Sequence, residues 1–214
     1  MYLPKHFAET DLGVMHALIR ANPLATLVSH GPDGLNANHV PLQLDASTGP
    51  NGTLRGHLAR ANPLSKPGAP QGDFLQGAVD GEILVIFQGT HSYISPSGYA
   101  TKAEHGKVVP TWNYTAVHAY GSLHLIDDAN WLLAQLTALT AEHEAKLPQP
   151  WAVSDAPADY LDKMLGAVVG IEIPIERLIG KWKVSQNQPA VNQASLVTAL
   201  AGSPMADLIA ARQQ

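Results

Sequence analysis

The sequence predicts a mainly β protein, an antiparallel barrel with flanking helices. About seven short segments show the alternation or the apolar runs that are typical of β-strands. The first five of these segments follow one another with no helical pattern between them, which argues against a doubly wound α/β fold. Helical patterns occur before, between and after the strand segments, so we expect helices to flank the barrel.

The first half of the chain predicts one helix followed by strands. Thr10 or Asp11 caps the helix, and Asn22-Pro23 ends it. An apolar run at 82–89 implies burial on both faces, as in a closed barrel. Strands are predicted at 24–30, 35–45, 53–59, 82–89 and 91–95, with a turn at 31–34 and loops at 47–52, 65–73 and 95–106.

The second half predicts further strands and three helices. Residues 108–126 alternate over a long span, which indicates one bent strand or two in series. The remaining elements are a helix begun by Asp127 or Asp128 with Leu132, Leu136 and Leu139 on one face, a helix from Pro157 to about 168, a strand with one wet face at 169–176, and a short helix begun by Ser203-Pro204. We expect one domain over residues 1–200 and a short C-terminal helix over 201–214.

Composition narrows the class of protein. The chain has 214 residues, a formal net charge of −5 and 14% charged residues, so nothing draws it as a whole to nucleic acid or to an anionic membrane. It has no cysteine, which excludes disulfides and thiolate chemistry. No apolar run approaches the ~20 residues that cross a bilayer, and no signal peptide is visible. We expect a cytoplasmic protein.

Familiar nucleotide, hydrolase and metalloprotease motifs do not occur in the chain. His118 and His124 are six residues apart on the predicted long strand and therefore share a face, but no third ligand is apparent. We expect no metal site.

The most informative segment runs from Gly180 to Asn187. If residues 181–187 are extended, Lys181, Lys183, Ser185 and Asn187 share one face, because side chains alternate along a strand. Two cations, a hydroxyl and an amide beside an indole suit a ligand with an anionic end and a flat polar ring. The alternative is a solvated amphipathic edge strand.

A second segment, Pro110 to Tyr114, also places a tryptophan beside an amide and a hydroxyl. Trp112 and Trp182 can stack on a planar ring or can serve as core or interface anchors.

Three further polar residues lie within predicted strands or at their ends. Arg60, which follows His57, can clamp a phosphate in a bidentate manner or can be a surface residue. Gln88 ends the apolar run and needs a partner if buried, either backbone or the edge of a flavin or pterin ring. His39 stands beside Pro41, which indicates an edge strand or a bulge, and it is either near a site or structural.

Nine segments together resemble one family. They occur in order over roughly residues 1–200, at 1–7, 22–28, 39–42, 56–63, 87–89, 92–97, 106–114, 169–173 and 180–187. The chain resembles the PaiB family of FMN-binding negative transcriptional regulators. It departs from the family pattern at Gly98-Tyr99-Ala100, where the family has Trp-Tyr-Pro, and at Gln188, where the family has arginine.

The resemblance implies an FMN-binding split β-barrel like that of pyridoxamine-phosphate oxidases, working as a homodimer with FMN at the subunit interface. It implies that Arg60, with His57 and Asn62, takes the phosphate and that Gln88 meets the ring edge. The candidate cofactor-binding residues are His39, His57, Arg60, Asn62, Gln88, Thr111, Trp112, Asn113, Lys181, Trp182, Lys183, Ser185, Gln186 and Asn187.

The function implied by the resemblance is negative regulation of transcription, and DNA binding rests on the resemblance alone. The alternatives are a flavin-dependent oxidoreductase of unassigned substrate and a split-barrel protein that binds haem. No side chain has a clear acid–base role, but in flavoproteins the cofactor carries the chemistry, so the sequence leaves enzymatic activity open.

Overall fold

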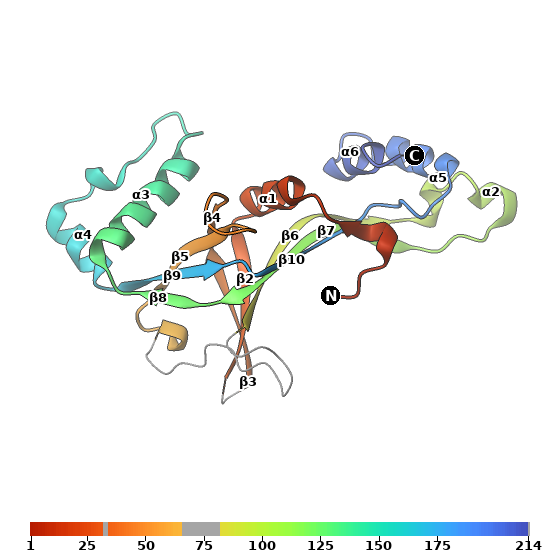
Figure 1. Ribbon diagram of the computed structural model, residues 1–214. Coiled ribbons are helices and arrows are strands. Elements are labelled where there is room, and N and C mark those ends of the chain that lie inside the picture. Colours follow the sequence, from red (N-terminus) through yellow and green to blue (C-terminus); the bar gives the residue numbers. More distant parts are fainter. Residues whose placement is uncertain (32–33, 66–81, 214) are drawn as a thin grey trace. The chain divides into compact units, whose positions relative to one another are not determined.

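The computed structural model describes residues 1–31, 34–65 and 82–213 (Figure 1). The α-helices are α1 Leu12–Ala21, α2 Lys102–His105, α3 Ala129–Glu144, α4 Ala158–Leu165, α5 Ala190–Ala199 and α6 Pro204–Ala210. The strands are β1 Ala8–Glu9, β2 Leu24–Gly31, β3 Gly34–Pro41, β4 Gln43–Asp45, β5 Thr53–Ala59, β6 Glu82–Ile94, β7 Thr111–Ser122, β8 His124–Ile126, β9 Val168–Pro174 and β10 Arg177–Lys183. The protein is mainly β with flanking helices, as predicted.

The strands form two sheets, in the orders β1-β10-β7-β6-β2-β3 and β4-β5-β9-β8. Neighbours such as β2 and β3, β2 and β6, and β5 and β9 pair in antiparallel fashion. No helix in the described residues is long and apolar enough to span a membrane.

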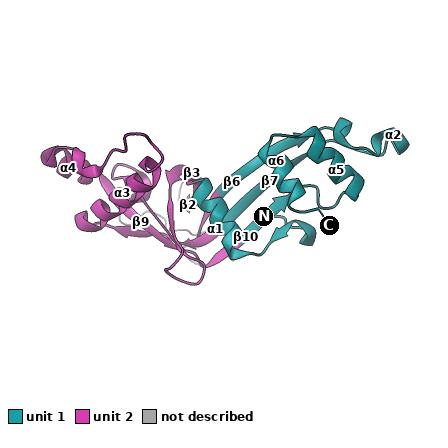
Figure 2. Ribbon diagram, turned by 90° about the horizontal axis from the view of Figure 1, so that it is seen from above, with its two compact units in different colours: residues 1–22, 87–118, 179–214 teal, residues 23–86, 119–178 magenta. Residues whose placement is uncertain are grey.

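The chain divides into two compact units (Figure 2). Unit 1 consists of Met1–Asn22, Phe87–His118 and Ile179–Gln214, and unit 2 consists of Pro23–Ile86 and Ala119–Leu178. Strands β6 and β7 contribute residues to both units. The single domain over residues 1–200 stays a prediction.

In unit 1, helices α1, α5 and α6 lie on the same side of strands β6, β7 and β10 (Figure 1). Gly180 of β10 allows α1 to come close, because a Cβ there would lie 2.8 Å from Met15 Sδ. At the far end of β6 a core cluster is formed by Ile94, Tyr99, Val184, Leu196, Met205 and Ile209. Burial of these apolar side chains holds α5 and α6 to the strands.

An ion pair joins the two ends of the chain within unit 1. Arg212, just after α6, donates to the buried carboxylate of Glu9 in β1. The other carboxylate oxygen of Glu9 accepts from the backbone N of Asp11 at 2.8 Å. Asp11 in turn caps α1 by accepting from Val14 N. Glu9 therefore connects β1, the start of α1 and the C-terminal residues.

In unit 2, α3 packs on strands β5 and β9 of the four-stranded sheet. Leu132 of α3 is buried. The helix faces the side of the sheet that carries Gly170 and His57, while Leu54 and Ile171 are buried on the other side. The indole of Trp131 lies directly over Gly170 of β9, where a Cβ would come within 2.4 Å of the ring.

Several predicted elements are confirmed. Strand β5 has the predicted limits, and three caps are as expected, with Asp11, Asp128 and Ser203 accepting hydrogen bonds from the first turns of α1, α3 and α6. The predicted long strand at 108–126 is two strands in series, β7 and β8. The turn at 31–34 and the loop at 65–73 fall largely at 32–33 and 66–73, outside the described residues.

Other predictions were wrong. The strands expected at 82–89 and 91–95 are one strand, β6, and burial on both faces is not observed, because Leu84 and Ile86 are partly exposed while Ile83 and Val85 are buried. The strand expected at 35–45 is broken, since Pro41 has no N–H and Leu42 N donates instead to Pro23 O.

Helix α5 was missed because Asn192 and Gln193 occupy its buried face, where the helical pattern requires apolar residues. The loop expected at 95–106 contains the short helix α2.

We expect Gly170→Ala to lower the free energy of unfolding by about 1–3 kcal/mol, because the added methyl group collides with the Trp131 ring. The matched control is Gly166→Ala at the end of α4, where the nearest atoms lie 3.5 Å or more from the added Cβ. Urea unfolding of both variants measures the difference, and equal midpoints would contradict the close packing of Trp131 on β9.

Candidate functional site

Two lysines of β10 form the centre of the candidate site in unit 1. Because Gly180 and Trp182 face α1, Lys181 and Lys183 point to the opposite side of the sheet. Lys181 is only 6% exposed; its Nζ donates to Tyr2 O at 3.0 Å and lies 5.2 Å from the centre of the Tyr114 ring. We call the surface made by Lys181, Lys183, Trp112 and Tyr114 the lysine face.

Lys183 is bound to the start of β7. Its Nζ donates to Thr111 Oγ1 and, at 2.5 Å, to the backbone carbonyl of Trp112. The pKa of Lys183 is lowered, first by burial and then by the charge of Lys181. The charge of Lys181 therefore disfavours the protonated state of Lys183.

Neither lysine has an acidic partner among the residues that the structure describes. No carboxylate among the described residues forms an ion pair with Lys181 or Lys183. The pKa of His118, further along β7, is lowered by burial, then by the N-terminal amino group and by Lys181. A buried ammonium group without a counter-charge is rare and costly, so this face suits an anion.

The segment after Lys183 is not the extended strand that the sequence predicted. Strand β10 ends at Lys183, and Ser185 adopts a left-handed backbone with φ of 66°. Gln186 holds this turn, because its Oε1 accepts from Val184 N at 2.8 Å and its Nε2 donates to Trp182 O at 2.5 Å. The predicted common face of residues 181 to 187 was therefore wrong beyond Lys183.

Two predicted polar residues contact each other instead of pointing into solvent. Asn113 is 1% exposed and its Nδ2 donates to Ser185 Oγ at 2.8 Å. Asn187 is exposed in the same turn. Asn113 and Ser185 fix the position of the 184–187 turn beside the start of β7.

The two tryptophans differ. Trp182 is buried against α1's side of the sheet and is a core anchor, whereas Trp112 is 54% exposed. The rings of His91 and Tyr93 in β6 each lie 5.9 Å from the Trp112 ring. Sequence reasoning missed this exposed aromatic group, although alternation along 91–95 and 108–126 could have paired the two strands.

Gln88 is exposed on β6, so its amide is not a buried group that needs a partner, and its place at the ring edge stays a prediction. Buried and partly exposed residues alternate along β6 up to Phe87. The alternation stops there, and Gln88 is exposed to solvent.

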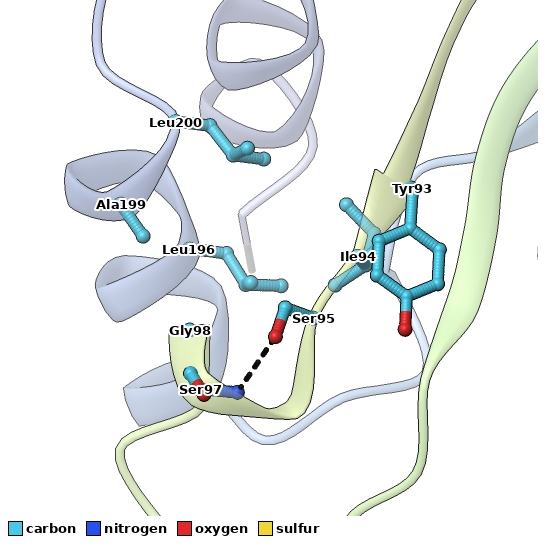
Figure 3. Close-up of a pocket in the computed structure, with 8 residues that line it drawn as sticks. All are labelled: Tyr93, Ile94, Ser95, Ser97, Gly98, Leu196, Ala199 and Leu200. Carbon is cyan, nitrogen blue, oxygen red and sulfur yellow. Dashed lines mark hydrogen bonds between the residues drawn. The ribbon is translucent and has the colours of Figure 1, made fainter.

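A hollow of about 280 Å³ lies where the end of β6 meets α5 (Figure 3). Its walls include Tyr93, Ile94, Ser95, Leu196, Ala199 and Leu200. Ser95 Oγ accepts from Ser97 N within it. None of the residues that line it is charged, so it suits an apolar group and not a phosphate.

The remaining predicted residues lie in unit 2, where Arg60 is already engaged. Its guanidinium makes two hydrogen bonds to Asp127, at 2.7 and 2.9 Å, and two more to the carbonyls of Gly166 and Val168. The hydrogen bonds between them raise the pKa of Arg60 and lower that of Asp127. The acceptors that a phosphate would supply are here supplied by the protein.

His57, Asn62 and His39 are also paired within unit 2. His57 Nδ1 lies 3.1 Å from Gln135 Oε1, and Asn62 Nδ2 donates to Asn38 Oδ1 at 2.9 Å. His39 is exposed on β3, with Nδ1 3.2 Å from Thr26 Oγ1.

Histidines do not gather into a metal site in the part of the chain that the structure describes. His118 belongs to β7 and His124 to β8, which lie in different sheets. No group of three His, Asp or Glu side chains in the described ranges could hold a metal ion.

The fold is that of the flavin-binding split β-barrels related to pyridoxamine-phosphate oxidases. A flavocytochrome from Azotobacter vinelandii aligns with a TM-score of 0.57 at 14% identity, covering 85% of this chain and 72% of that one. A 5-nitroimidazole resistance protein from Bacteroides thetaiotaomicron aligns with a TM-score of 0.53 at 13% identity, covering 81% and 85%.

The chain belongs to the family described as "Putative FMN-binding domain", whose model matches residues 1–177. An uncharacterised protein of Emericella nidulans is 39% identical over 87% of this chain and 84% of its own length. The Bacillus subtilis protein "Protease synthase and sporulation protein PAI 2" is 29% identical over 94% and 89%. The predicted resemblance to the PaiB family is confirmed, and FMN is the cofactor of this family.

We expect Lys183 to make the free energy of unfolding rise with pH. Its folded-state pKa lies below the ordinary value of 10.5, so unfolding takes up a proton between these two pH values, and the contribution of Lys183 to stability increases as the pH is raised through that window. Urea unfolding at neutral pH and just below pH 10.5 measures the rise. The rise should shrink in Lys183→Met and persist in Lys163→Met, an exposed lysine of α4; equal slopes would contradict it.

Proposed function

We propose that this protein binds FMN on the lysine face and acts as a regulator of the PaiB type. The observation that carries the proposal is the pair Lys181 and Lys183, which is buried or half-buried, has no carboxylate among the described residues and lies beside an exposed indole. FMN offers a phosphate for the cations and a flat tricycle for the aromatic surface.

In this proposal Lys183 and Thr111 hold the phosphate, and the charge of Lys181 adds to the attraction. Trp112, with His91 and Tyr93 beside it, lies against the ring. FMN, when bound, supplies reversible uptake of one or two electrons. Asn113, Ser185 and Gln186 act indirectly, because they hold the 184–187 turn that follows the lysines.

We also propose that two chains associate through this face. Tyr93 and Trp112 are more than half exposed, and aromatic side chains of this kind are enriched at protein interfaces. The family resemblance, which implies FMN at a subunit interface, supports this proposal. Light scattering of the purified protein should give twice the chain mass of 22.7 kDa; a mass of one chain at micromolar concentration would contradict the dimer.

Regulation of transcription is supported by the family resemblance. The B. subtilis relative is named "Protease synthase and sporulation protein PAI 2", which associates it with sporulation. The net charge of −5 and the dispersed cations favour an effect through a partner over direct contact with DNA. A gel shift with the DNA upstream of its own gene tests direct binding. A cytoplasmic location also stays a prediction.

A flavin-dependent redox role is the second candidate. His91 is exposed beside Trp112, and two of the similar structures are named as a flavocytochrome and as an FAD- and haem-binding protein. Anaerobic addition of NAD(P)H to the FMN-loaded protein, followed by its absorption spectrum, tests for flavin reduction. A Soret band after haem addition, with no flavin binding, would favour a haem protein.

We expect Lys183→Met to weaken FMN binding at least tenfold, about 1.4 kcal/mol or more, because the phosphate loses its cation. Titration of the apo-protein with FMN, followed by quenching of flavin fluorescence, measures the affinity. Lys163→Met is the matched control and should bind as the wild type does.

The same titration tests whether Lys183 or Arg60 binds the phosphate. Since Asp127 already occupies the guanidinium, we expect Arg60→Ala to keep the affinity within about threefold. A tenfold loss in Arg60→Ala, with unchanged affinity in Lys183→Met, would assign the phosphate to Arg60 as the sequence analysis did.

A further inference from the structure

A pocket of about 350 Å³ lies in unit 2 between α3 and strands β4 and β5. It is lined by Gln43, Arg55, Trp131, Ala134, Gln135 and Ala138. None of these residues belongs to the lysine face. Its volume is at the lower end of the range for small-molecule sites.

Gln135 gives this pocket an unmet hydrogen-bonding need. The side chain is 5% exposed, and its Oε1 is 3.1 Å from His57 Nδ1. Its Nε2 is buried and makes no hydrogen bond to any residue in the described ranges. A buried donor left in this state costs about 1–3 kcal/mol, and an acceptor oxygen in the pocket that Gln135 lines would remove that cost.

The other polar groups around the pocket limit the charge that a ligand can carry there. Arg55 is paired with Asp45 and Glu172, each at 2.9 Å, through Nη1 and Nε, and its Nη2 takes part in neither pair. Glu142 accepts from Gln43 Nε2 at 2.8 Å. Two carboxylates therefore pair with the one guanidinium and a third accepts from Gln43, so a further anion would be repelled.

Asp45 remains ionised over the whole physiological range. Hydrogen bonds from Ser47 and Thr48 hold the pKa of its carboxyl well below the usual value, with Arg55 adding to the effect. The negative balance around the pocket is thus permanent at neutral pH.

The walls favour a flat molecule. Trp131 supplies an indole that is fixed by its packing on Gly170, and Ala134 and Ala138 are too small to fill the space beside it. Around this wall stand a free donor on Gln135, a donor on Arg55 and an acceptor, Oε1, on Gln43.

We propose that this pocket binds a small, neutral, planar ring that carries an amide, such as a nicotinamide or a pyrimidine base. Its carbonyl oxygen accepts from Gln135 Nε2 and Arg55, and its N–H donates to Gln43 Oε1. The ring lies against Trp131. The pocket shares no residue with the lysine face, so the inference depends neither on FMN binding nor on the proposed regulatory role.

Calorimetric titration of the full chain with nicotinamide, uracil and nicotinate tests the proposal. We expect saturable binding of at least one of the two amides, with nicotinate bound at least tenfold more weakly than nicotinamide if nicotinamide is the ligand that binds, because it replaces the amide with a carboxylate. Binding of uracil alone assigns the pocket to pyrimidines. Absence of saturable binding of both amides, or equal binding of nicotinamide and nicotinate, would overturn the proposal.

Two variants locate the site. Ala138→Phe fills the pocket and Gln135→Leu removes the donor, and each should weaken amide binding at least tenfold. Ala141→Phe, exposed on the same helix and outside the pocket, is the matched control and should bind normally. FMN titration of the same variants should be unchanged, so a failure here and a failure at the lysine face can be told apart. Wild-type affinity in both pocket variants would place the amide elsewhere.

Discussion

The candidate site depends on the burial of positive charge that no carboxylate in the described part of the chain balances. Lys181 and Lys183 are held by carbonyls, a hydroxyl and aromatic rings, which satisfy their hydrogen bonds but leave their charge unbalanced. An anionic ligand therefore gains more here than at an exposed lysine, where water already solvates the cation. The exposed Trp112 next to them gives the same place an affinity for flat rings.

Arg60 shows why residue type alone misassigns a phosphate site. The sequence offers an arginine at a strand end, which is a suitable clamp, but its partner Asp127 is 67 residues away. No pattern in the sequence around Arg60 indicates that contact. The lysines differ from Arg60, because their spacing in the sequence correctly predicted that they share one face. Only the structure could show that acidic partners are missing among the described residues.

Strands and helices with strong local signals were predictable, as β5 and the capped starts of α1, α3 and α6 show. Elements that depend on tertiary contacts could not be predicted from the sequence. Helix α5 buries amides in place of apolar side chains, and the turn at Ser185 rests on the side chain of Gln186. Gln135 likewise breaks the apolar face predicted for α3, and that break is where the second pocket lies.

The ion pair between Arg212 and Glu9 makes the last residues of the chain matter to the first ones. Loss of Arg212 would leave the buried Glu9 carboxylate without its cation and would loosen β1, which pairs Ala8 with Lys181. Tyr2, whose carbonyl binds that lysine, lies just ahead of the loosened strand. The loss of this one cation would thus change the electrostatic surface around Lys181.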